Sequence, residues 1–346
     1  LKLGKLYNDK EIKDYIAKDY KKYNKQIIDL DKKVSAEKEK PEFSIDELKR
    51  RQYLAGLSIE DLELILHPMA EEGKEATGSM GDDTPAAVLS SYYRPISHYF
   101  RQNFSQVTNP PIDSLRENKV MSLKTRFGNL GNILDFDNLT EENIYVLESP
   151  ILTNSQFKKF KSIFKSKIRV IDCTFDINSS LKDRIEKIRD EAETAVREGS
   201  NNLILSDKKI DTSRASIPSV LAVGAIHSHL VKLGIRGYCS INVESSDILD
   251  THSFAVLIGV GATTINPYLA IESIFERFQK KLFSNVDFDT CVAKFKKSIN
   301  NGLLKIMSKM GISVVSSYRG GCNFEAVGLS RAIVADYFPG MSSRIS

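Results

Sequence analysis

Cysteine is scarce and scattered in this sequence. The four cysteines, Cys173, Cys239, Cys291 and Cys322, lie far apart, with no C-x-x-C pair or comparable cluster. Structural zinc sites and iron–sulfur clusters need several cysteines at short spacing. The sequence therefore argues against either kind of centre inside this chain, and it favours reduced thiols in a cytoplasmic protein.

Long apolar runs are missing as well. The longest, at residues 220–226 and 254–260, fall well short of the roughly 20 residues that span a bilayer. No signal-peptide pattern opens the chain, so we expect no membrane partner. The sequence begins with Leu1 rather than Met and stops at Ser346, and we interpret it as an excised or processed piece of a longer protein.

An excess of charge of one sign is also absent. The 49 basic and 45 acidic residues leave a formal net charge of +4, and acidic residues are interleaved with the lysines of the first forty positions. This pattern is typical of solvated helix faces and predicts no nucleic-acid partner. The chain has 346 residues, of which 41% are hydrophobic, so it can build a core for one large or two medium domains.

From about residue 144 the pattern predicts an α/β fold. Strands are expected at residues 168–171, 202–205, 237–243 and 255–260, and helices at 181–197, at 217–233 and from about 267. Continuous apolar runs are typical of strands buried on both faces, and their alternation with helices indicates parallel βαβ units. The pattern does not choose between an open doubly wound sheet and a partial or closed barrel.

The first third of the chain is predicted to be mainly helical. The spacing of apolar residues predicts helices at 10–33, 44–56, 58–68 and 93–107, with a charged linker at 34–43. A capping box at Ser44 and breaks at Gly56 and Pro68 set the limits of the middle two. We therefore expect an α-helical N-terminal extension before the α/β part.

Two stiff loops are the most informative feature. Residues 78–85 combine two glycines, two carboxylates and a proline around Met80, and residues 106–113 hold Thr108 and Asn109 before a double proline. Two rigid loops this close in sequence suggest a constructed site. The carboxylates at 82 and 83 suit helix capping better than acid–base chemistry. Met80 suits a contact with a flat aromatic ligand or a core-filling role equally well.

Three other patterns stay open. Glycines at 259 and 261 fit an incomplete dinucleotide fingerprint or a tight strand-to-helix turn. His227, His229 and His252 are better suited to packing and hydrogen bonding than to a metal. The small residues and Arg319 at 316–321, between an expected strand at 312–315 and an expected helix from 324, fit an anion site or an ordinary turn. No Walker motif and no identifiable catalytic triad is present.

Several long runs together resemble the central region of the large subunit of glutamate synthase. They are EATGSMGDDTP at 75–85, FSQVTNPPID at 104–113, INPYLA at 265–270, KIMSKMGIS at 305–313 and FEAVGL at 324–329. The resemblance covers nearly the whole chain from about residue 50. Because the runs occur in the same order, they are far more specific than any single motif.

The resemblance implies a role inside a larger enzyme. In this family an amidotransferase domain hydrolyses glutamine, and the ammonia passes through an internal channel to an FMN-binding synthase domain. There 2-oxoglutarate is aminated and the imine is reduced by FMNH2, which an iron–sulfur cluster supplies with electrons. A small electron-donating subunit or ferredoxin delivers those electrons. The central domain would be a scaffold, a partial or degenerate barrel related to the FMN domain.

The resemblance also assigns residues. Residues 1–43 would be a helical linker from the amidotransferase domain, and residues 44–346 the central domain, leading toward an FMN-binding domain that is not present. Met80, with Ser79 and Gly81 beside it, would lie near the flavin, while Thr108 and Asn109 would line the ammonia channel. No catalytic or metal-binding residue is expected.

We expect the fragment alone to bind neither FMN nor a cluster and to be inactive. Two alternatives remain: a non-catalytic structural or binding module, and a nucleotide-dependent oxidoreductase built on residues 259–263.

Overall fold

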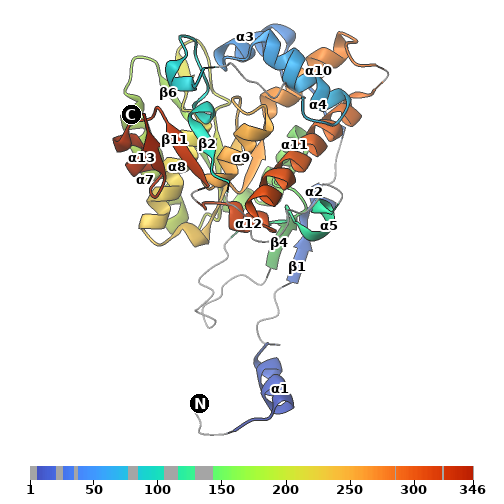
Figure 1. Ribbon diagram of the computed structural model, residues 1–346, viewed down its shortest axis with the longest axis vertical. Coiled ribbons are helices and arrows are strands. Elements are labelled where there is room, and N and C mark those ends of the chain that lie inside the picture. Colours follow the sequence, from blue (N-terminus) through green and yellow to red (C-terminus); the bar gives the residue numbers. More distant parts are fainter. Residues whose placement is uncertain are drawn as a thin grey trace.

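A four-stranded parallel sheet lies at the centre of the chain (Figure 1). Its strand order is β10-β9-β7-β5, and each neighbouring pair is parallel. The strands are β5 (Ile168–Asp172), β7 (Asn202–Ser206), β9 (Ser240–Glu244) and β10 (Thr264–Asn266). Because β5 and β10 occupy its two edges, the described sheet is open rather than closed into a barrel.

The computed structural model describes residues 6–20, 26–34, 38–76, 85–104, 116–128, 143–284, 286–321 and 323–345.

Helices connect successive strands of the parallel sheet. α7 (Leu181–Arg197) follows β5, α8 (Ser219–Lys232) follows β7, and α9 (Thr251–Gly259) follows β9. α7 begins where the Ser180 hydroxyl accepts the backbone N–H of Asp183 at 3.3 Å. The fold class is therefore α/β with parallel βαβ units, and the sequence predictions for the first three strands and for α7 and α8 are confirmed.

The expected strand at residues 255–260 is wrong, because this run belongs to α9. The carboxylate of Asp250 accepts the backbone N–H of Ser253 at 3.0 Å and caps the helix. Nearly every residue of α9 is buried, so the helix has no polar stripe. Its continuous apolar run is equally typical of a buried central strand. The strand comes later, as β10, and α10 (Tyr268–Gln279) follows it as expected.

Three smaller sheets flank the parallel one. Their orders are β1-β4-β3, β12-β11-β2 and β6-β8. The strands are β1 (Gln26–Asp29), β2 (Phe100–Gln102), β3 (Thr125–Phe127), β4 (Asn143–Leu147), β6 (Thr174–Asp176), β8 (Arg214–Ser216), β11 (Phe324–Val327) and β12 (Ser342–Arg344).

Local spacing fails in the regions that form β2 and β11. The described part of the helix expected at 93–107, residues 93–104, holds a short 3-10 turn, η4 (Ile96–Tyr99), followed by β2, and the helix expected from 324 is β11. The two strands pair antiparallel, and the ring of Phe100 packs edge-on against Phe324. Pairing between distant segments outweighs local helical spacing here. The strand expected at 312–315 is wrong too, since α12 (Val315–Tyr318) begins at its last residue.

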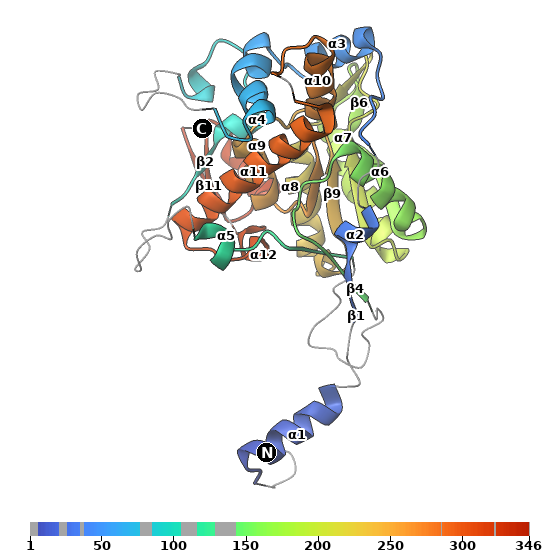
Figure 2. The ribbon, with the colours of Figure 1, turned by 90° about the vertical axis from the view of Figure 1, so that its right-hand side faces the viewer.

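The N-terminal region is only partly the helix expected at 10–33. α1 (Asp9–Tyr20) confirms its first half and stands apart from the body of the chain (Figures 1 and 2). Residues 26–29 form β1 instead, so the prediction is wrong there, and the chain is helical again in α2 (Leu30–Val34). β1 pairs parallel with β4, and burial of Leu30 and Val34 in a second hydrophobic cluster holds this segment on the body.

Residues 38–43, expected as part of a linker, lie against the body. The hydroxyl of Ser155 donates to the carboxylate of Glu39 at 2.5 Å, and the Phe43 ring lies 6.1 Å from that of Tyr268. The division of the chain at residue 43 stays a prediction.

Capping residues set the next helix as predicted. Ser44 accepts the backbone N–H of Glu47 at 3.3 Å at the start of α3 (Ile45–Leu54), and Gly56, at φ +72°, follows its end. The predicted stop at Pro68 is wrong. A wide π turn, η2 (Asp61–Leu66), leads into α4 (His67–Glu71), so the proline sits inside a continuous helical segment.

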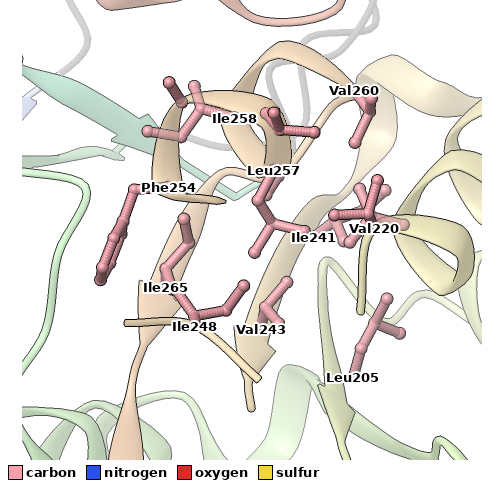
Figure 3. Packing of buried hydrophobic residues seen from close by; sticks show 14 of the residues in the cluster. Leu205, Val220, Ile241, Val243, Ile248, Phe254, Leu257, Ile258, Val260 and Ile265 are labelled. Carbon is pink, nitrogen blue, oxygen red and sulfur yellow. The ribbon is translucent and has the colours of Figure 1, made fainter. Parts of the chain in front are cut away.

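The main hydrophobic core lies between the parallel sheet and its helices. This cluster includes Ile241 and Val243 of β9, Phe254 and Leu257 of α9 and Ile265 of β10 (Figure 3). The remaining helices are α5 (Glu117–Val120), α6 (Asn154–Ile163), α11 (Phe288–Met310) and α13 (Arg331–Tyr337), with 3-10 turns η3 (Ala87–Leu89), η6 (Lys165–Lys167) and η7 (Arg236–Tyr238). Of the helices described, not one combines the length and apolar character that crossing a membrane requires.

Candidate functional site

The site residues that the sequence singles out fall outside the described residues. Ser79, Met80 and Gly81, with the neighbouring carboxylates, belong to residues 77–84, and Thr108 and Asn109 belong to residues 105–115. The chain is described on both sides of each stretch. These flanking residues define the candidate site.

The flanks of the two loops meet at one cavity of about 270 Å³, here called the loop-flank cavity. Residues 73–75 come just before the first loop, and Glu117 comes just after the second. The remaining wall is one face of α11. The lining residues are Gly73, Lys74, Glu75, Glu117, Ser298, Asn301, Gly302 and Lys305. The fold therefore brings one end of each predicted loop to the same place.

Packing on α11 fixes both flanks. α4, which leads to the first loop, and α5, which follows the second, both pack against this long helix (Figure 2). The ammonium of Lys294 donates to the backbone carbonyl of Glu71 at 2.6 Å and ties the end of α4 to α11. α11 itself is capped by Asp287, whose carboxylate accepts the N–H of Thr290 at 3.0 Å, and it ends at Gly311.

The first turn of α9 lies behind the loop-flank cavity. An added Cβ at Gly302 would lie 2.5 Å from Cγ2 of Thr251 and 3.1 Å from the Glu75 carboxyl carbon. Only glycine allows this approach of α11 to α9. The hydroxyl of Thr251 is buried and has no hydrogen-bond partner in the described part of the chain. The wall of the cavity is therefore polar and closely packed.

A second cavity, of about 230 Å³, borders the other end of the first loop. Residues 85–87 form one wall, and basic side chains dominate the others. The lining residues are Pro85, Ala86, Ala87, Arg94, His98, Arg101, His252 and Val327. His252, which lines this cavity, follows Thr251, whose side chain lies against Gly302 of the loop-flank cavity.

The start of the second loop is held by β11 and α12. The backbone N–H of Asn103 donates to the carbonyl of Asn323 at 2.7 Å, just beyond the end of β2. The Tyr318 hydroxyl donates to Oε1 of Gln102 at 2.7 Å. Residues 103 and 104 thus leave the body in a fixed direction.

The described thiols are not activated nucleophiles. Cys173, Cys239 and Cys291 are buried and unpaired. Burial raises the pKa of Cys291 to about 11 and raises the pKa of Cys173 and of Cys239. Thiolates are the reactive species, so these three cysteines serve packing.

The histidines of the sequence hypothesis have separate structural partners. His229 pairs with Glu193 at 3.0 Å, and Nε2 of His252 lies 3.0 Å from the carbonyl of Ser97. His227 accepts from Arg236, as described below. Within the described ranges, no three His, Cys, Asp or Glu side chains converge as metal ligands do.

Residues 259–263 do not lie between a strand and a helix, as the dinucleotide-binding hypothesis requires. The fingerprint requires a strand before the glycines and a helix after them. Here Gly259 is the last residue of α9, and β10 follows at Thr264. This helix-to-strand turn is the reverse of both readings, so the fingerprint and the tight strand-to-helix turn are both wrong.

Comparison with known protein families identifies the family of this chain. The model of the glutamate synthase central domain matches residues 50–330. The chain belongs to the glutamate synthase central domain family. The expected resemblance is therefore confirmed.

Curated relatives of this central domain match it along its whole length. It is 54% identical to the large chain of glutamate synthase [NADPH] from Azospirillum brasilense and 41% identical to that from Bacillus subtilis, and each match covers 100% of this chain. It is 38% identical to the chloroplastic ferredoxin-dependent glutamate synthase 2 of Arabidopsis thaliana, again over 100% of the chain. The central domain spans only 22–23% of the length of these relatives.

Among solved structures, the likeness is remote. The recombinant flavin-binding domain of baker's yeast flavocytochrome b2 matches with a TM-score of 0.39 and 9% identity, covering 85% of this chain and 96% of that one. A likeness this weak assigns neither a ligand nor an activity.

Sequence reasoning missed the wall of the loop-flank cavity in this central domain. Thr251 and Gly302 gave no motif, and their contact joins two residues about fifty positions apart in the chain. One signal was present: a glycine inside a long amphipathic stretch often marks a close approach of another backbone or side chain.

Proposed function

We propose that this chain is the central scaffold and ammonia-channel domain of a glutamate synthase large subunit. That enzyme makes glutamate from glutamine and 2-oxoglutarate by reductive amination. In this proposal, the chain supplies no catalytic residue. It holds an amidotransferase domain and an FMN-binding domain of the same polypeptide at fixed positions and lines the ammonia path between them.

One observation carries the proposal beyond family membership. Stretches bordering both predicted loops, residues 73–75 and Glu117, line one polar cavity on α11. Two loops that serve one path must begin or end near each other, and these do. Ammonia is small and hydrogen-bonding, and the hydroxyl, amide and carboxylate groups of this cavity, which lie beside two lysines, can accept its N–H groups.

The residue roles in this proposal come from the family resemblance, since residues 77–84 and 105–115 lie outside the described part of the chain. Met80, flanked by Ser79 and Gly81, faces the flavin of the neighbouring domain, because a polarisable thioether packs well against an aromatic ring system. Thr108 and Asn109 line the ammonia path. The fold is a degenerate barrel related to that of the FMN domain, which the open parallel sheet and its βαβ connections support.

FMN and an iron–sulfur cluster belong to other parts of the polypeptide in this proposal. Relatives whose names specify NADPH, NADH or ferredoxin all match nearly the whole of this chain. The central domain therefore does not select the electron donor. A small electron-donating subunit or ferredoxin contacts the enzyme elsewhere, and the protein is cytoplasmic.

A domain exchange tests the function. The matching region of the Azospirillum brasilense large chain is replaced by this chain, and glutamine hydrolysis and glutamate formation are measured together. We expect the hybrid to form glutamate at a rate close to that of the parent. A hybrid that folds and hydrolyses glutamine but forms no glutamate would contradict the proposal. The isolated chain is the control, and it should form none even with added FMN and reductant.

A further inference from the structure

Two guanidinium groups and an imidazole meet at the end of α9 opposite the loop-flank cavity. Arg236 donates from Nε to Nδ1 of His227 at 3.1 Å and from Nη2 to the carbonyl of Gly261 at 2.9 Å. Arg319 donates from Nε to the next carbonyl, that of Ala262, at 2.9 Å. Gly261 and Ala262 lead directly into β10, so the cluster lies at the amino end of the parallel sheet.

No carboxylate balances this charge in the described ranges. The acceptors of both guanidinium groups are neutral: the imidazole and backbone carbonyls, including that of Cys239 at 2.6 Å. Burial, followed by the like charge of Arg236, lowers the pKa of Arg319 to about 10. Two cations close together in a partly desolvated place call for an anion.

One donor of the cluster is left over. Nη2 of Arg319 is buried and has no hydrogen-bond partner within the part of the chain that the structure describes. An orphaned buried N–H group in a folded protein often marks a missing ion or ligand.

His227 adds a second donor. Its Nδ1 accepts from Arg236, so the proton of the neutral ring sits on Nε2. Burial and the two guanidinium groups lower the pKa of His227 to about 4 and keep the ring neutral. An added Cβ at Gly320, whose φ is +69°, would lie 3.2 Å from Nε2, so the glycine leaves this edge of the ring uncovered by a side chain.

We propose that Arg236, Arg319 and His227 form a binding site for an oxyanion, a carboxylate or phosphate group. Guanidinium groups bind such oxygens through charge-assisted hydrogen bonds, which are about twice as strong as neutral ones. The oxyanion is either a small free anion or a carboxylate supplied by the rest of the polypeptide. Arg319 belongs to residues 316–321, for which the sequence left an anion site or an ordinary turn open. The proposed oxyanion site does not depend on the proposed function.

A titration of the 346-residue chain tests the site. Phosphate and glutarate are added, with chloride at matched ionic strength as control, and binding is followed by calorimetry and by the His227 pKa from NMR. We expect saturable binding of at least one oxyanion, together with a rise of the His227 pKa above about 4. An oxyanion beside the ring favours its protonated form.

Variants separate this site from general charge effects. Arg319→Met should weaken oxyanion binding by about tenfold or more, whereas Arg331→Met, at the exposed start of α13, should leave it unchanged. If Arg319→Met does not fold, His227→Asn replaces it, since Asn retains an acceptor for Arg236 and removes the Nε2 donor. Equal loss in the site and control variants would overturn the proposal.

The same NMR measurement on the full-length polypeptide distinguishes the two sources. A His227 pKa that is already raised and insensitive to phosphate identifies a carboxylate of the polypeptide. A pKa that still responds to phosphate identifies a small free anion. A pKa that stays near 4 in both proteins, without saturable binding, would contradict the site.

Discussion

A Cβ atom added to Gly302 would lie 2.7 Å from the hydroxyl oxygen of Thr251. This contact brings the middle of α11 onto the first turn of α9, where Gly302 lines one of the cavities that border the first predicted loop and His252 lines the other. The spacing of these helices therefore sets the shape of the candidate site.

Replacing Gly302 by alanine should destabilise the chain. Alanine improves helix propensity by about 1 kcal/mol, but its methyl group would clash with a short, buried, β-branched side chain, at a typical cost of about 1–3 kcal/mol. We expect a net loss of about 1 kcal/mol in guanidinium unfolding. In a Thr251→Ala background the clash disappears and Gly302→Ala should become stabilising. A stabilising effect in the parent chain would show that the helices are not in close contact.

Asp207 predicts a pH-dependent stability. It is buried at the carboxyl end of β7, and burial raises its pKa from 3.8 to about 6, although Ser245 and Ser246 donate hydrogen bonds to it. Its raised folded-state pKa means that its contribution is fully present below pH 3.8 and is lost as the pH rises through 6.

Asp207→Asn should therefore gain stability over the parent as the pH rises. The difference in unfolding free energy should be small at pH 4 and reach the order of 2 kcal/mol at pH 8. Guanidinium unfolding across this range measures it. A difference that does not change with pH would mean that Asp207 titrates alike in both states.

The contribution of His227 to stability should change with pH in the opposite direction. Its pKa is lowered from 6.5 to about 4, so its contribution is present above pH 6.5 and is lost as the pH falls through 4. His227→Asn keeps an acceptor for Arg236 and cannot titrate. Relative to the parent, the variant should become more stable as the pH falls from 7 to 4 in chloride buffer. A flat difference would remove the reason to regard the ring as neutral.

Glu39 should anchor the N-terminal segment to the body. Its carboxylate accepts the backbone N–H of Ser155, in the first turn of α6, at 3.0 Å, where the helix dipole favours negative charge. Glu39→Gln should lower the unfolding free energy by about 0.5–1 kcal/mol. The matched control is Lys40→Gln at an exposed neighbouring position, which should change little. Equal effects would show that the contact does not hold the segment.

The sequence predicted the elements whose signals are local. α3 begins at the predicted serine cap, and the strands at 168–171 and 202–205 alternate with amphipathic helices such as α7, so the cap and the periodicity were sufficient. It failed where distant segments decide the structure. β2 and β11 exist because they pair with each other, and α9 has no polar stripe because it is buried on every side.

For the candidate site, too, the local features could be predicted and the long-range contacts could not. Glycine and proline content identified the two loops, and a family resemblance gave them a role. The shared cavity depends on α4 and α5 packing against α11, which no local pattern encodes. The contact of Thr251 with Gly302 likewise arises only when α9 and α11 meet.

The most direct test of the channel role is the ratio of glutamate formed to glutamine hydrolysed in the full-length enzyme. With Thr108→Trp, we expect glutamine hydrolysis to continue while this ratio falls, because the indole blocks the ammonia path and ammonia escapes. Thr108→Ser is the control and should keep the parental ratio. An unchanged ratio in a folded Thr108→Trp enzyme would contradict the account.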